Sequence, residues 1–155
     1  MRIDLDNRLA CSFPNLYQDR TTGNRKSRMH DGFTCGNGWF PLLHSLSKKL
    51  EALIMKLPEN KRRFYRATQV KQKFGSLNFY MYDRTPEMRV LIDKAIKKSS
   101  KTCEVCGRSG SLIQIPGRWV TTSCVKHEKI TAWQEMEKID IHWTAKLLSL
   151  FEVFL

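Results

Sequence analysis

The feature that most constrains the fold is a pair of matched spacings between Cys103 and His127. Two residues separate Cys103 from Cys106, and two separate Cys124 from His127. A Cys-x-x-Cys turn lets both thiolates reach one ion at about 2.3 Å, and a second pair completes a tetrahedron. Zn²⁺ accepts three sulfurs and an imidazole without redox chemistry. The sequence therefore predicts one structural zinc ion bound by these four residues.

A redox role for the Cys103 and Cys106 pair is the alternative to a metal site. Redox-active Cys-x-x-Cys motifs are expected in a thioredoxin-like βαβ context. They need neither a second ligand pair nor the glycine that follows Cys106. We therefore favour zinc over redox use or a chance spacing.

The residues around the ligands predict a knuckle, a hairpin and a helix. Gly107 can adopt a positive φ and lets the chain curl round the metal. Apolar segments at 112–115 and 119–122, punctuated by Pro-Gly, fit a hairpin. Hydroxyl residues before Cys124 are expected to cap a helix over 124–137, with the second ligand pair on its first turn. The arrangement resembles treble-clef zinc sites, which serve many functions and so imply architecture alone.

The centre of the chain predicts a helix, a hairpin and a second helix. Pro41 suits a first helical turn, apolar residues then recur at helical spacing, and Pro58 stops the run. Alternating segments at 68–73 and 77–82, joined by a turn, fit a β-hairpin. Thr85 is expected to cap the second helix, which has one apolar stripe and a lysine-rich opposite side.

These segments predict an α+β fold that forms a single compact domain. Residues 1–31 are a poorly patterned basic segment whose part from 18 to 31 reads as a mobile basic loop. Residues 32–101 form the α+β core, and residues 102–138 form an integrated, treble-clef-like zinc module. Residues 139–155 are strongly apolar, and we favour a C-terminal helix docked on the core over a partner surface.

The charge balance is the unusual feature of the composition. The 155 residues include 27 Lys and Arg against 15 Asp and Glu, a net charge of +12. Such a surplus favours phosphate backbones, acidic protein surfaces or anionic membranes as partners, although it can also mean only a soluble basic surface. Hydrophobic residues make up 41% of the chain, which argues against disorder.

Cysteine usage and the N-terminus predict a cytosolic protein. The zinc set leaves Cys11 and Cys35, and the residues after Met1 do not form a leader peptide. Together with zinc thiolates, this favours a reducing compartment. The apolar stretches are also shorter than the roughly 20 residues of a membrane span.

A run from Lys61 to Arg66 interleaves cations with Phe64 and Tyr65. Cations neutralise phosphates while aromatic faces stack on bases, as in single-strand platforms. The alternative, which we favour, is that the aromatic residues enter a strand and the charges stay in water. The candidate residues for an anionic partner are Lys61, Arg62, Arg63, Arg66, Lys71, Lys73, Lys94, Lys97, Lys98 and Lys101.

Residues 33–40 contain a candidate site of unknown role at Cys35, Asn37 and Trp39. Glycines on either side of Asn37 predict a sharp turn that delivers Trp39 into a core or pocket. Cys35 could be a nucleophile, but no histidine partner is identifiable, and a buried thiol is the commoner outcome.

Three stretches, 32–40, 69–80 and the zinc segment with Trp119, resemble a family of small proteins encoded by bacteriophages, prophages and bacteria. The resemblance covers about residues 32–127 and departs at Thr34 and Asn37, where the family usually carries acids, and at the apolar tail. Its members are mostly described as hypothetical. The resemblance implies a phage accessory protein in the bacterial cytoplasm, with a role in host takeover or counter-defence, and it implies no reaction.

We expect a non-enzymatic zinc protein that binds nucleic acid or a host nucleoprotein complex. A second hypothesis is an inhibitor or adaptor of a host protein, with the apolar tail or Trp39-Phe40 as the contact. A metal-dependent nuclease is a third, because some treble-clef sites support cleavage. It is disfavoured because four ligands close the zinc site, and the helix that follows shows no catalytic His-His or His-Asn pair. The oligomeric state is left open.

Overall fold

The structure is a computed structural model, and it describes residues 1–21, 27–114 and 120–128. The chain divides into two compact units, Met1–Cys124 and Val125–Leu155. The described residues of the second unit, 125–128, are helical. The first unit combines helices with two small antiparallel sheets, which confirms the predicted α+β class.

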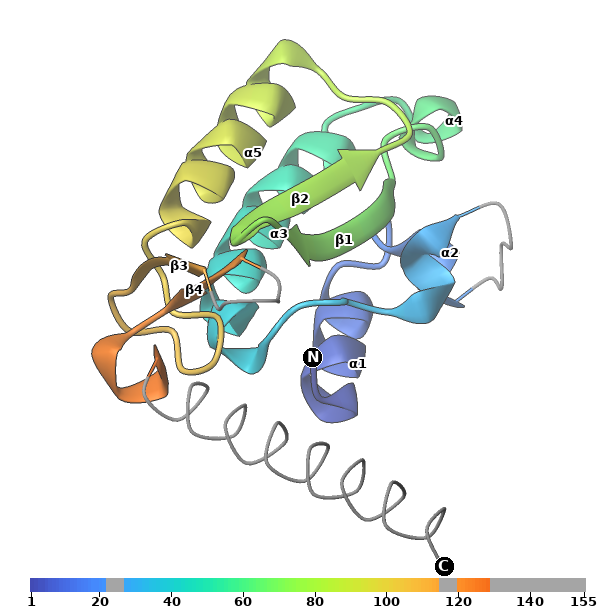
Figure 1. Cartoon of the computed structure of the whole chain (residues 1–155). Coiled ribbons are helices and arrows are strands. Elements are labelled where there is room, and N and C mark those ends of the chain that lie inside the picture. The colour runs from blue at the N-terminus through green and yellow to red at the C-terminus, as the bar shows by residue number, and fades with distance from the viewer. Residues whose placement is uncertain (22–26, 115–119, 129–155) are drawn as a thin grey trace, which may run out of the picture. The chain divides into compact units, whose positions relative to one another are not determined.

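Helices precede and follow the two strands of the β1–β2 sheet (Figure 1). The elements of the first unit are, in order, α1 (Ile3–Ser12), α2 (Gln18–Thr21), η1 (Arg28–Asp31), η2 (Asn37–Trp39), α3 (Phe40–Met55), α4 (Glu59–Arg62), β1 (Ala67–Lys73), β2 (Ser76–Met81), α5 (Pro86–Ser99), β3 (Ser111–Gln114) and β4 (Val120–Ser123).

Helix α3 is the central core helix, as its periodicity predicts. Pro41 lies in its first turn, where its missing N–H is not needed. The apolar stripe is buried along the helix: Leu42, Leu43, Leu46, Leu50 and Ile54. The helix ends at Met55, before Pro58.

Strands β1 and β2 form the predicted hairpin. They pair antiparallel, with Val70 opposite Phe79. Phe74 and Gly75 both have positive φ, 53° and 73°, as the tightest hairpin turns require. Val70, Leu77 and Phe79 are buried in the core, so one face of the hairpin is committed to packing.

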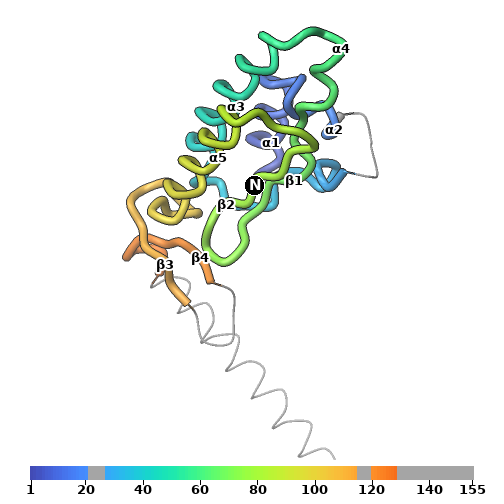
Figure 2. The backbone as a smooth tube through the Cα atoms, turned by 90° about the horizontal axis from the view of Figure 1, so that it is seen from above, coloured from blue at the N-terminus to red at the C-terminus, as the bar shows by residue number. Residues whose placement is uncertain are grey.

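Helix α5 begins with the predicted threonine cap. The Thr85 hydroxyl accepts from the Met88 backbone N–H at 3.3 Å. Figures 1 and 2 show α5 beside α3, and both helices contribute buried side chains to the same core. The Ser99 hydroxyl accepts from the Leu77 N–H at 2.8 Å, which fixes the end of α5 to the start of β2.

The N-terminal segment differs from the expectation of a poorly patterned basic stretch. It forms α1, α2 and η1, and the segment buries Leu9 of α1, Met29 of η1, and Phe13, Leu16 and Tyr17 between α1 and α2. Helices this short have weak signals of their own and are stabilised mainly by tertiary packing. Their apolar spacing therefore did not stand out in the sequence.

The basic loop expected at 18–31 is wrong for the described residues 18–21 and 27–31. Arg20 donates to the buried carboxylate of Asp6 at 2.9 Å, so its charge serves the fold. Asp6 also accepts from the Phe33 N–H at 2.8 Å. The buried Asp19 accepts from Arg66 at 2.9 Å. Burial makes these pairs structural, because an unpaired buried charge is costly.

The second sheet joins β3 to β4, with Ser111 opposite Ser123. It corresponds to the hairpin predicted in the zinc module. Two side-chain hydrogen bonds attach it to the first hairpin: Gln72 Nε2 donates to the Val120 carbonyl at 2.6 Å, and Thr122 Oγ1 donates to the Gly75 carbonyl at 2.5 Å. The two small sheets therefore support one another at the tip of the β1–β2 hairpin.

Two predictions for the C-terminal part concern residues beyond 128. The zinc-module helix beyond residue 128 and the apolar helix at 139–155 lie outside the described residues. In the described ranges, no helix combines the length and the hydrophobicity that a membrane span needs.

Candidate metal centre

Three cysteines and a histidine meet where the zinc spacing predicts. Cys103 and Cys106 lie in a turn after α5, Cys124 directly follows β4, and His127 lies in the helical residues 125–128. One ligand atom from each lies within 4.8 Å of all the others. The structure thus brings together all four predicted ligands, in a group that could hold a metal ion.

The local backbone explains how the turn forms. Gly107 has φ of +77°, a conformation that costs a glycine little, and its N–H donates to the Cys103 carbonyl at 2.8 Å. The Cys103 N–H in turn donates to the Arg108 carbonyl at 2.7 Å. Because Ser111 pairs with Ser123, the β3–β4 ladder returns the chain to Cys124 beside this turn.

The cysteine geometry fits a tetrahedral metal ion. The Cys106 and Cys124 sulfurs are 3.8 Å apart. Metal–sulfur bonds of about 2.3 Å in a tetrahedron also place two sulfurs about 3.8 Å apart. No disulfide joins cysteines in the part of the chain that is described. Cys103 and Cys124 are buried while Cys106 is exposed.

Arg108 favours the metal-binding form of the exposed ligand. Its Nε lies 3.5 Å from the Cys106 sulfur. The hydrogen bond from this guanidinium, with a second from the Arg108 backbone, lowers the pKa of Cys106 to about 6. The thiolate is the form that ligates metals. Arg108 was not singled out from the sequence, although a cation two residues after a ligand cysteine is the signal that would have found it.

The hydroxyls before Cys124 do not cap the helical residues, contrary to the prediction. Thr121 donates to the Glu104 carboxylate at 3.1 Å, and Thr122 donates to Gly75 as described above. The Ser123 hydroxyl is buried and has no hydrogen-bond partner among the described residues. All three residues belong to β4, so strand geometry directs their side chains toward the neighbouring segments.

The segment from Gly36 to Trp39 forms a cradle for the knuckle, residues 103–107. The Gly38 N–H donates to the Glu104 carbonyl at 2.7 Å, and the Gly36 N–H donates to the Glu104 side chain at 2.8 Å. The fully buried Trp39 donates from its indole N–H to the Thr102 carbonyl at 2.8 Å. Backbone and side-chain groups of the cradle therefore hold the knuckle in place.

Close approach explains both glycines of this cradle. A Cβ on Gly38 would lie 2.6 Å from the Cys106 nitrogen and would also meet the Cys103 carbonyl and the Gly107 nitrogen. A Cβ on Gly36 would meet the Glu104 carbonyl and would lie 2.7 Å from its Cγ. Only glycine lets the two backbones touch in this way.

The other members of the candidate site of unknown role also make structural contacts. Asn37 Oδ1 accepts from the Arg2 backbone N–H at 2.8 Å, which ties the start of α1 to the cradle. Cys35 is buried, and this burial raises its pKa to about 12. Its thiol therefore stays protonated near neutral pH, which is the opposite of an activated nucleophile.

The candidate basic residues do not form one cluster. Arg62 donates to the carbonyls of Met55, at the end of α3, and of Leu57, at 2.9 and 3.0 Å, and Arg66 pairs with Asp19. These two arginines therefore have structural roles. The remaining candidates are exposed except for the half-buried Lys71: Lys61, Arg63, Lys73, Lys94, Lys97, Lys98 and Lys101.

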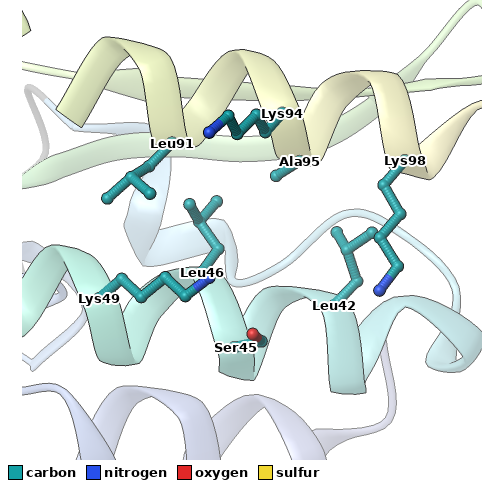
Figure 3. A pocket seen from close by; sticks show the side chains of 8 residues that line it. All are labelled: Leu42, Ser45, Leu46, Lys49, Leu91, Lys94, Ala95 and Lys98. Atoms are coloured by element: carbon teal, nitrogen blue, oxygen red, sulfur yellow. The ribbon is translucent and has the colours of Figure 1, made fainter. Parts of the chain in front are cut away.

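Helices α3 and α5 enclose a groove of about 140 Å³ that gathers lysines from both helices (Figure 3). Lys49 comes from α3, and Lys94 and Lys98 come from α5; Lys98 extends toward α3 in this view. The rest of the lining is Leu42, Ser45, Leu46, Leu91 and Ala95. Lys49 was not among the predicted site residues, because only the packing of α3 beside α5 brings it to the same groove as the α5 lysines.

Comparison with family models, with curated proteins and with solved structures found no match.

Proposed function

We propose that this chain is a non-enzymatic protein that binds one structural zinc ion through Cys103, Cys106, Cys124 and His127. Three sulfurs and an imidazole are a typical structural zinc set, and softer thiolate ligands disfavour Mg²⁺ or Ca²⁺. The order of knuckle turn, β3–β4 hairpin and helical residues also supports a treble-clef arrangement. Four protein ligands leave a tetrahedral ion no open position for a substrate, which favours a structural role.

The proposed activity is binding of an anionic partner, namely nucleic acid or a nucleoprotein complex of a bacterial host. In this proposal the protein is a phage accessory factor that acts in the bacterial cytoplasm in host takeover or counter-defence. The observation that carries the binding proposal is the lysine-rimmed groove between α3 and α5.

Lys49, Lys94 and Lys98 all line this groove. Among the ion pairs of the described ranges, none involves these three lysines. Like charges gathered from two helices repel one another. A phosphate backbone that enters the groove would neutralise them and release its own counterions, which favours binding at low salt.

Charge reversal in the groove tests the binding proposal. The variant Lys94→Glu with Lys98→Glu is compared with Lys48→Glu with Lys56→Glu, which makes the same change of net charge at exposed residues that do not line the groove. Fluorescence anisotropy with labelled DNA and RNA strands across a salt series measures affinity. We expect only the groove variant, Lys94→Glu with Lys98→Glu, to bind weakly. The slope of the logarithm of its affinity against the logarithm of salt concentration should be reduced by roughly 2. Equal effects of the two variants, or binding that ignores salt, would contradict the proposal.

The alternative function is an inhibitor or adaptor that contacts a host protein. The half-buried Leu91 in the groove supports this alternative, because it offers some apolar surface between the lysines. Affinity purification from bacterial lysate, with and without nuclease, separates the two functions. A partner that survives nuclease but is lost with the groove variant indicates protein contact, whereas a nuclease-sensitive partner supports nucleic acid.

A further inference from the structure

The outer face of the β1–β2 hairpin is a second surface that the core does not use. Register places Tyr80 opposite Gln69, and Asn78 opposite Lys71, on the face away from the buried Val70 and Phe79. Tyr80 is 43% exposed, and Tyr82, which directly follows β2, is 62% exposed. Large apolar groups that gather at a surface often mark an interaction site.

Phe64, which precedes β1, places a third ring near Tyr82. Its centroid lies 6.2 Å from that of Tyr82, with the ring planes 32° apart, and it is 36% exposed. The Arg66 guanidinium carbon is 4.4 Å from the Tyr82 centroid, and the Arg63 carbon is 4.8 Å from that of Phe64.

The position of Tyr82 is held by the fold before any partner binds. The Tyr82 N–H donates to the Arg66 carbonyl at 2.9 Å, and Arg66 is fixed by its ion pair with Asp19. A platform that is already ordered loses little conformational entropy when it binds. These rings can therefore contribute most of their contact energy to a partner.

The charges on this hairpin indicate what kind of partner fits. Lys71 and Lys73 lie on β1, and neither belongs to any ion pair of the residues described. Rings interleaved with cations are the chemistry of single-strand binding, in which bases stack on aromatic faces and phosphates meet lysines. A duplex keeps its base faces stacked inside, and an apolar protein surface would leave the cations unmatched.

We propose that the outer face of the β1–β2 hairpin binds single-stranded nucleic acid, with bases stacked on Tyr80, Tyr82 and Phe64 and the phosphates near Lys71 and Lys73. This inference rests on the proposed function, because it takes the partner to be a nucleic acid. It adds that the nucleic acid is single-stranded and that it contacts a surface separate from the α3–α5 groove.

The test uses labelled 12-nucleotide strands of thymidylate and of uridylate, a duplex of the same length, and an abasic strand with the same phosphates. We expect the full-length protein to bind both base-containing strands more tightly than the abasic strand and the duplex. The variant Tyr82→Leu keeps apolar bulk but removes the π face, and it should weaken strand binding about 5-fold to 150-fold. Tyr82→Phe, which keeps the ring, should bind like the unmodified protein.

Each contrary result has a distinct meaning. Equal binding of thymidylate and abasic strands, or full binding by Tyr82→Leu, overturns the stacking inference. If the groove variant Lys94→Glu with Lys98→Glu still weakens binding in that case, the proposed function survives alone. Binding to none of the nucleic acids overturns both. Thermal unfolding of each variant shows whether a loss of binding reflects a loss of fold.

Discussion

At the scale of single residues, Gly38 shows most directly why the cradle sequence has its composition. The three backbone groups that a Cβ would meet all belong to the knuckle that presents Cys103 and Cys106. Gly36 and Gly107 make close approaches on either side of the same contact. The glycines therefore support the candidate metal centre without being ligands.

We predict that Gly38→Ala destabilises the protein by about 1–3 kcal/mol, because the added methyl forces two backbones apart. The free energy of unfolding from denaturant titration measures the effect, and metal content by mass spectrometry shows whether the ligands are displaced. Ser109→Ala is the control, because this exposed residue lies in the same loop and should change stability by less than about 0.5 kcal/mol. An unchanged stability for Gly38→Ala would show that the knuckle can shift away.

At the scale of elements, one hydroxyl connects α5 to β2. Ser99 Oγ accepts from the Leu77 N–H and donates to the Ile96 carbonyl at 2.6 Å, and Ser99 is fully buried. Leu77 begins the buried face of the hairpin just after its turn. This contact fixes where the hairpin lies along α5, and with it the position of the aromatic outer face.

We predict that Ser99→Ala destabilises the protein by about 1–3 kcal/mol, because the buried Leu77 N–H loses its acceptor. Ser100→Ala is a matched control, because its hydroxyl donates only to the Lys97 carbonyl near the surface. Denaturant titration of both variants gives the comparison. Equal small effects would mean that the Leu77 N–H finds water or another acceptor.

At the scale of the whole molecule, the metal centre is connected to segments far away in the sequence. Gly36 and Glu104 are 68 residues apart, and Trp39 and Thr102 are 63 apart. Through Asn37 the same cradle reaches the start of α1. The folding of the knuckle and the ordering of the N-terminal helices are therefore expected to depend on each other.

We predict that metal removal by a strong chelator speeds hydrogen exchange at the Gly36 and Gly38 amides at least about tenfold, because both donate to Glu104 in the knuckle. The Leu50 amide, in the middle of α3, should change less. Exchange measured by NMR or mass spectrometry, with metal re-addition as the reversal, checks this. Unchanged exchange at the cradle after proven metal loss would mean that the knuckle holds its shape without an ion.

Local patterns in the sequence were sufficient for the ligand set and for the central elements. Spacing identified the four candidate ligands, periodicity with flanking prolines identified α3, alternation with a glycine turn identified the β1–β2 hairpin, and Thr85 marked the start of α5. Each signal lies within a few residues, because capping, turn formation and the two side-chain periods are local properties of the backbone.

Only the tertiary structure decided what depends on distant partners. The N-terminal helices are ordered by burial against the core, and Lys49 meets Lys94 and Lys98 only because α3 lies beside α5. The need for glycine in the cradle is explained by the knuckle backbone that lies against it. Contacts between segments tens of residues apart are set by how the elements pack, and that packing leaves no periodic signal in either segment.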